Sequence, residues 1–163
     1  IEIGHVFQLG RKYAEALGLT VLDQNGKTQV VTMGSYGIGV SRAVAAIAEA
    51  NHDELGLKWP TAVSPADVHI VIAGKPGDET AGAGEKIAKE LSAKNMTVIL
   101  DDRKGVSPGV RFKDAELIGT PRIIIAGRGV ATGVVEVRNR RAGTASEIAL
   151  ADAAEFVAKM PAT

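Results

Sequence analysis

Short aliphatic runs that alternate with helical segments in the second half of the chain restrict its fold more than any other feature. Three runs have the length and composition of buried strands, namely VHIVIAG at 68–74, TVILDD at 97–102 and RIIIAG at 122–127. The segments between them, 79–95 and 110–119, have helical patterns. Strands that alternate with helices indicate an α/β fold with a mainly parallel sheet covered on both faces.

The remainder of this half continues the alternation. Residues 134–139 predict a further strand, whereas 146–150 are ambiguous. Residues 152–160 predict a closing helix, for which Asp152 is a plausible N-cap. At about 100 residues, the segment 67–163 is long enough to fold as a domain.

The first half is less complete. Residues 1–50 predict two strands and two helices, with a hairpin turn at Asn25-Gly26, and so few elements make a poor domain by themselves. We expect these residues to be the end of a larger domain. Residues 51–66 contain two prolines and a tryptophan and follow no period, which predicts a linker. The predicted elements of the first half are strands at 1–8 and 28–33 and helices at 10–17 and 38–50.

Composition restricts the chemistry of the chain. It has no cysteine, which excludes disulfides and thiolate metal sites, and its three histidines lie far apart in sequence, so no metal site is predicted. No apolar run approaches the roughly 18 to 20 residues of a membrane span. The first residues have neither the basic start nor the apolar stretch of a signal peptide, and we expect a cytoplasmic protein.

The net charge of zero conceals an uneven distribution. Residues 103–141 contain nine lysines and arginines against three acidic residues, a local excess of six positive charges. Such an excess is typical of proteins that bind a polyanion, because neutralised phosphates release counterions. A solvated basic face would produce the same count.

The stretch TMGSYGIGVSR, residues 32–42, has three glycines before a helix. It matches neither the P-loop nor the dinucleotide-binding pattern. Glycines nevertheless let a backbone approach a ligand closely, and helix N-termini attract anions. Arg42 in the first turn opposes the helix dipole, so a bound anion would explain its position. The alternative is a tight turn with an exposed arginine.

Three segments resemble one family in the correct order. MGSYGIGVSR resembles motif 3 of class II aminoacyl-tRNA synthetases, and IEIGHVFQLGRKYAEALG resembles the segment before motif 3 in bacterial-type prolyl-tRNA synthetases. DDRKGVSPGVRFKDAELIGTP resembles the signature of the anticodon-binding domain shared by the prolyl, histidyl, threonyl and glycyl enzymes. The resemblance implies a three-layer anticodon-binding domain at 67–163, preceded at 1–50 by a fragment of an antiparallel-sheet catalytic domain.

The family activates proline with ATP and Mg²⁺ and transfers the prolyl group to tRNA. The resemblance implies that Arg42 contacts the ATP triphosphate as the catalytic residue, while Gly37 and Gly39 shape the adenine site. An arginine beside leaving pyrophosphate stabilises developing charge. The residues that match positions near the proline pocket are His5, Phe7 and Ser35. His5 is equally consistent with a structural histidine.

The resemblance also implies a binding site for the anticodon stem-loop of tRNA(Pro). Phe112 is a candidate stacking surface, although it would also suit a core, and Glu116 is a candidate acceptor for a guanine edge. Family members often have a lysine where Thr144 and Ala145 stand, so this chain would have to use Arg140 or Arg141 instead, or lose the contact. The further candidates for RNA binding are Arg103, Arg111, Arg122, Arg140 and Arg141.

The family's motifs 1 and 2, and in many members an editing domain, would precede residue 1. We therefore expect a C-terminal fragment, inactive alone, of an enzyme that forms a homodimer. Two alternatives are a non-catalytic RNA-binding protein that reuses the anticodon domain and a threonyl or glycyl synthetase. Arg42 argues against the first alternative, and GHVFQLG argues against the second.

Overall fold

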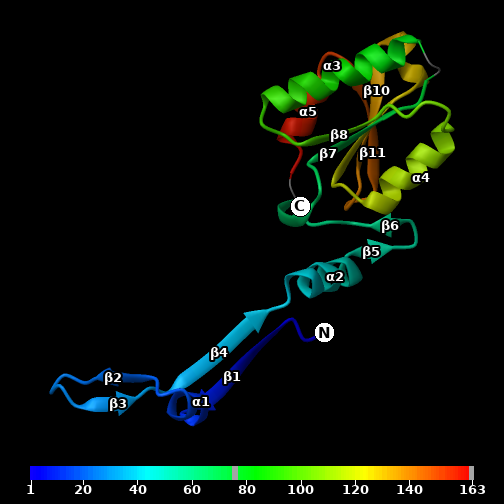
Figure 1. Ribbon diagram of the computed structural model, residues 1–163. Coiled ribbons are helices and arrows are strands. Elements are labelled where there is room, and N and C mark those ends of the chain that lie inside the picture. Colours follow the sequence, from blue (N-terminus) through cyan, green and yellow to red (C-terminus); the bar gives the residue numbers. More distant parts are fainter. Residues whose placement is uncertain (75–76, 162–163) are drawn as a thin grey trace. The chain divides into compact units, whose positions relative to one another are not determined.

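The chain forms two compact units, Ile1–Ile47 and Ala48–Thr163, in the computed structural model, which describes residues 1–74 and 77–161 (Figure 1). Each unit has its own secondary structure and is described separately below. No helix among the described residues is long and apolar enough to cross a membrane.

The first unit is built on an antiparallel pair of strands, β1 and β4. A second pair, β2 and β3, forms the hairpin predicted around Asn25-Gly26, and Gly26 has the positive φ of +74° that such a turn requires. The elements are β1 (Gly4–Gly10), α1 (Lys12–Ala16), β2 (Thr20–Leu22), β3 (Thr28–Val30), β4 (Met33–Ile38) and α2 (Val40–Ala50), whose last residues belong to the second unit.

The glycine-rich stretch is a strand and not a turn, which corrects the sequence interpretation. Gly34 and Gly37 lie inside β4, opposite Gln8 and His5 of β1. Only Gly39 lies between the strand and α2, and its amide donates to the carbonyl of Ile3 at 2.8 Å. Glycine is a poor strand former, so the pairing with β1 and not local propensity determines the conformation here.

The second unit contains a five-stranded mixed sheet in the order β11-β10-β9-β7-β8. Strands β8, β7 and β9 are parallel, as predicted, and β10 and β11 continue the sheet in antiparallel fashion. The elements are β5 (His52–Asp53), β6 (Gly56–Leu57), η1 (Thr61–Val63), β7 (Val68–Ile72), α3 (Glu79–Ala93), β8 (Val98–Asp101), α4 (Pro108–Ile118), β9 (Arg122–Ala126), η2 (Arg128–Thr132), β10 (Val134–Asn139), β11 (Thr144–Ala149) and α5 (Ala153–Lys159).

Helices cover both faces of this sheet and give the three layers that were predicted (Figure 1). On one face, Ile70 and Ile124 pack with Leu91 of α3 and with α5. On the other face, a smaller cluster of buried residues joins Val71 and Ile123 to α4. Successive residues of a strand point to opposite faces, so β7 and β9 supply both layers of core.

Capping residues define the ends of α4. The hydroxyl of Ser107 accepts a hydrogen bond from the amide of Val110, and Gly119 ends the helix in the left-handed conformation at φ +75°. Asp152 stands at the N-cap position of α5, but its side chain makes no capping hydrogen bond, so its predicted capping role is wrong. The ambiguous segment 146–150 lies mostly in strand β11.

The segment predicted as a linker contains the hairpin β5–β6, which packs against α4. A Cβ atom on Gly56 would lie 2.4 Å from the Cα of Leu117, and one on Gly119 would overlap the carbonyl of Leu57. Two facing glycines therefore let the two backbones touch. Residues 51–58 belong structurally to the second unit.

Candidate nucleic-acid interface

One face of the sheet carries charged side chains on strands β9 to β11, beside α4. Val135 and Val137 of β10 are buried in the core cluster beneath α3 and α5. Because successive strand residues point to opposite faces, Glu136 and Arg138 point to the face covered by α4. Strand register places their neighbours directly across from them. The two rows on this face are Ile125–Glu136–Glu147 and Ile123–Arg138–Ala145.

Arg138 contacts several of the other side chains on this face. Its Nε donates to Glu136 Oε1 at 2.5 Å and its Nη1 to Glu116 Oε1 at 3.2 Å. Its guanidinium carbon lies 6.0 Å from the ring centroid of Phe112, within range of a cation–π contact. Because the side chains of Arg138 and Glu116 are 33% and 22% exposed, both remain partly accessible to a ligand.

Two features mark this face as more than a packing surface. Glu136 and Glu147 are directly opposed in the ladder, an arrangement of like charges that destabilises a sheet. Hollows also flank the cluster: one of about 390 Å³ is lined by Phe112, and one of about 250 Å³ is lined by Glu116 and Arg138. The face therefore offers space beside an aromatic ring, a cation and several carboxylates.

These groups have the chemistry that an unpaired nucleobase needs. A carboxylate accepts hydrogen bonds from the N1–H and N2–H₂ groups of guanine, a guanidinium donates to its O6, and an aromatic ring stacks on its face. The Glu116–Arg138 pair places such a donor and acceptor side by side. The carboxylates also disfavour phosphate, so this face suits base edges better than the RNA backbone.

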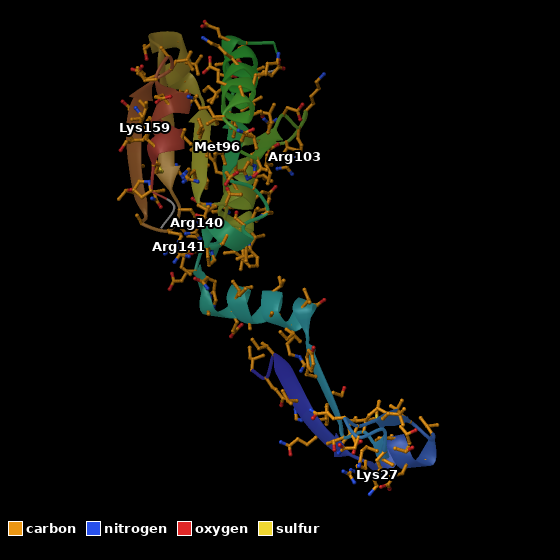
Figure 2. The ribbon with its side chains drawn as sticks, turned by 90° about the vertical axis from the view of Figure 1, so that its left-hand side faces the viewer. Lys27, Met96, Arg103, Arg140, Arg141 and Lys159 are labelled. Carbon is orange, nitrogen blue, oxygen red and sulfur yellow. The ribbon has the colours of Figure 1, made fainter. Side chains whose placement is uncertain are left out.

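Arg140 and Arg141 were predicted to bind RNA, and the structure directs both towards residues 51–58. Arg140, only 7% exposed, donates from both terminal nitrogens to Asp53, at 2.6 and 2.7 Å. Arg141 donates to the carbonyl of Lys58 at 2.8 Å and to the side chain of Asn51 at 3.2 Å. Both arginines lie at the same end of the unit, away from Arg103 (Figure 2).

The other predicted arginines lie outside the Glu116–Arg138 cluster. Arg103 bridges Asp101 and Asp114, each at 2.7 Å, and this contact lowers the pKa of the Asp101 carboxyl. The buried Arg111 donates to backbone carbonyls, including that of Arg103.

Arg122 lies on the opposite face of the sheet. It belongs to the same alternation of β9 as Ile124, and it donates to the carbonyl of Met160 at 2.8 Å. The structure therefore brings Phe112 and Glu116 together but does not bring Arg122 to them.

The sequence interpretation did not include Arg138 and Glu136 among the site residues. Their signal in the sequence is VVEVRN, where two charged residues at i and i+2 interrupt a strand of valines. Charges at that spacing share one face of a strand. A strand with one apolar and one charged face beside an RNA-binding signature would have pointed to both.

In the first unit, the predicted pocket residues share one face of the β1–β4 ladder. Phe7 is paired with Ser35, and His5 with Gly37, so these four positions lie side by side. The rings of His5 and Phe7 are 4.2 Å apart, and His5 Nδ1 lies 2.9 Å from a carboxylate oxygen of Glu2. Gly37 leaves open space opposite His5.

Arg42 lies in the first turn of α2 and is exposed. One terminal nitrogen donates to the carbonyl of Glu2 at 3.1 Å, which leaves further donors available to an anion. Gly39 precedes the helix, and a Cβ atom there would lie 3.3 Å from the Cβ of Arg42. Among the residues that the structure describes, no group of three or more His, Asp or Glu residues could hold a metal ion.

The partly charged sheet face of this α/β unit has groups suited to contact a nucleobase. The chain belongs to the anticodon-binding domain family: residues 67–160 match the family model described as "Anticodon binding domain". Residues 1–51 match the model described as "tRNA synthetase class II core domain (G, H, P, S and T)". The family membership and the fold class predicted from the sequence are thereby confirmed.

Two similar curated proteins have the same name, which is more specific than the family models. A protein of Paenarthrobacter aurescens named proline–tRNA ligase is 62% identical over 157 residues, which cover 96% of this chain and 26% of that protein. A protein of the same name from Bifidobacterium adolescentis is 59% identical over 160 residues, 97% of this chain and 26% of that protein. The chain thus spans about a quarter of the length of the relatives that it matches.

Proposed function

We propose that this chain is part of a prolyl-tRNA synthetase and that its second unit recognises the anticodon of tRNA(Pro). The observation that carries the proposal is the Glu116–Arg138 pair, partly exposed beside Phe112 and next to a hollow on the sheet face. Relatives named proline–tRNA ligase support the choice of proline over threonine or glycine.

In this proposal Glu116 accepts the N1–H and N2–H₂ groups of an anticodon guanine, and Phe112 provides a stacking surface. Arg138 donates to the base and, through its hydrogen bond, orients the Glu116 carboxylate. It would take the place of the family's lysine, since Ala145 stands across from Arg138 in the ladder and contributes no cation.

The first unit would supply one wall of the site for ATP, as its Mg²⁺ complex, and proline. Arg42 would bind the triphosphate and stabilise charge on departing pyrophosphate, with Gly37 and Gly39 admitting the nucleotide. The shared face of the β1–β4 ladder would line the proline pocket through His5, Phe7 and Ser35. We propose that the whole enzyme is a cytoplasmic homodimer.

Glu116→Gln tests the anticodon proposal. Stem-loop RNAs are titrated with the 163-residue chain, and the ratio of affinities for the proline anticodon and a guanine-to-adenine mismatch is measured. The amide of glutamine replaces an acceptor with a donor, so we expect the ratio to fall by about tenfold or more. Glu85→Gln on α3, on the other side of the sheet, changes the charge equally and should leave the ratio unchanged.

Equal affinity of the wild-type chain for matched and mismatched stem-loops would refute anticodon recognition. An unchanged ratio in Glu116→Gln, with a discriminating wild type, would refute only the role of Glu116. We also expect no proline-dependent ATP–pyrophosphate exchange from these 163 residues, since in this proposal they supply only one wall of the site for ATP and proline.

A further inference from the structure

We propose that the hairpin segment, residues 51–58, forms part of the anticodon-binding site. In this proposal Asp53 is a positioning residue that orients Glu116 through Arg140. The inference rests on the proposed function, because it assigns the hairpin a role in the same recognition. The sequence pattern gave this segment no function beyond connecting two domains.

Asp53 holds both the hairpin and a buried arginine. Its Oδ1 accepts hydrogen bonds from the amides of Leu55 at 2.9 Å and Gly56 at 3.2 Å, which shapes the turn. The same carboxylate accepts the two terminal nitrogens of Arg140, and these bonds hold the pKa of Asp53 well below its usual range. Lys58 Nζ lies 3.7 Å from Oδ2.

Arg140 connects this carboxylate to the candidate base reader. Its Nε donates to the backbone carbonyl of Glu116 at 3.3 Å, while its two terminal nitrogens are held by Asp53. An arginine fixed at three nitrogens and 7% exposed has little freedom to move. The position of the Glu116 backbone is thus tied to the hairpin by one rigid side chain.

The hairpin also reaches the site directly. The backbone at Gly56 touches α4 at Glu116 and Leu117, where a Cβ atom would overlap both residues. Leu55, with 58% of its surface exposed, lines the same hollow of about 250 Å³ as Glu116 and Arg138. An exposed leucine at the mouth of a base-sized hollow provides an apolar wall for a nucleobase.

Loss of the Asp53 carboxylate would therefore release Arg140 and shift Glu116 without removing any group that touches the base. Misplacement of a hydrogen-bonding group lowers discrimination between bases more than it lowers total affinity, because stacking and phosphate contacts remain. A purely structural role would lower stability and leave the ratio of matched to mismatched affinity unchanged.

The test compares Asp53→Asn with Glu54→Gln, its exposed neighbour, which changes the net charge equally. Affinities for the matched stem-loop and the guanine-to-adenine mismatch are measured at a temperature where melting curves show both variants folded. We expect Asp53→Asn to lower the affinity ratio about tenfold and Glu54→Gln to leave it unchanged. In the Glu116→Gln background, Asp53→Asn should cause no further loss of discrimination, since both act through one carboxylate.

A measurement on the wild-type chain covers the case in which Asp53→Asn does not fold. Amide hydrogen exchange at Leu55 and Gly56, whose N–H groups bind Asp53, should slow on addition of the matched stem-loop and much less with the mismatch. A discriminating wild type with unchanged exchange at these amides would overturn the inference. Equal ratios for Asp53→Asn and Glu54→Gln would also overturn it, while the role of Glu116 would stand.

Discussion

The contact between the hairpin and α4 predicts an unusually large effect of one methyl group, in Gly56→Ala. Gly56 has a φ of +144°, a region that disfavours residues with a Cβ atom. A Cβ atom there would lie 2.4 Å from Leu117 Cα and 2.6 Å from the carbonyl oxygen of Glu116. Both neighbours are backbone atoms, so the substitution must strain the turn or push the hairpin away from α4.

The size of the effect follows from these two costs. A residue held in a sparsely populated backbone region costs about 1–3 kcal/mol, and overpacking costs about 1–3 kcal/mol. We expect Gly56→Ala to lower the free energy of unfolding by about 4 kcal/mol. For a unit of this length that corresponds to a decrease in Tm of roughly 15 °C.

Two other glycines provide matched controls in the same unit. Gly133 also has a positive φ, +76°, but no atom lies within 4 Å of its Cβ position, so Gly133→Ala should cost only the backbone strain, about 1 kcal/mol. Gly109, in the first turn of α4, has neither problem, and Gly109→Ala should raise stability by about 0.5–1 kcal/mol. Thermal unfolding followed by circular dichroism measures all three. A Tm for Gly56→Ala within about 2 °C of that for Gly133→Ala would refute the close contact between hairpin and helix.

Two predictions concern pH. The ring nitrogens of buried His69 have no hydrogen-bond partner among the described residues, and burial lowers the pKa of His69 below 6.5. The unfolded chain therefore binds a proton at this residue more readily than the folded chain. As a result, the free energy of unfolding should fall as the pH drops below about 6.5. His69→Leu should leave the free energy of unfolding at pH 7 unchanged or higher, and should make its decline in acid shallower. Hydrogen bonds from Lys94 and Lys159 lower the pKa of Glu155 from 4.5 to about 2, so its contribution is full above pH 4.5 and disappears as the pH falls to about 2. Glu155→Gln should therefore be less stable than wild type at pH 7 and should approach the stability of wild type only below about pH 2, and urea titrations at several pH values measure both effects.

The parallel core could be predicted from the sequence because its strands are buried on both faces and read as unbroken aliphatic runs, as in β7 and β9. Strand β4 could not be predicted in this way, because MGSYGI has little strand propensity and its extended conformation depends on pairing with β1. The hairpin β5–β6 has two residues in each strand, too few for a pattern, and depends on contacts with α4.

The candidate site was predicted in part for a similar reason. Phe112 and Glu116 belong to one helix and one recognisable signature, so local sequence identified them. Arg138 lies 22 residues beyond Glu116 and joins it only because β10 pairs with β9 beside α4. Pairings of that kind are properties of the topology, which a single sequence does not reveal.

The basic segment 103–141 shows why charge counting does not locate an RNA site, and it leads to a last prediction. Six of its nine cations donate to carboxylates, side-chain amides or backbone carbonyls of the protein. Among the described residues, only Lys104, Lys113 and Arg128 have no such partner, so about three cations are available to phosphates.

Each neutralised phosphate of a single strand contributes about −0.7 to the slope of log affinity against log salt concentration. Three free cations predict a slope of about −2 for the anticodon stem-loop, whereas nine would give about −6. Titrations between 50 and 300 mM salt distinguish these values. A slope near −6 would mean that RNA displaces the internal partners of the arginines, including Asp53 from Arg140, and would contradict a rigid, preformed site. A slope near −2 with strong discrimination would show that base contacts, and not the positive charge of the segment, carry recognition.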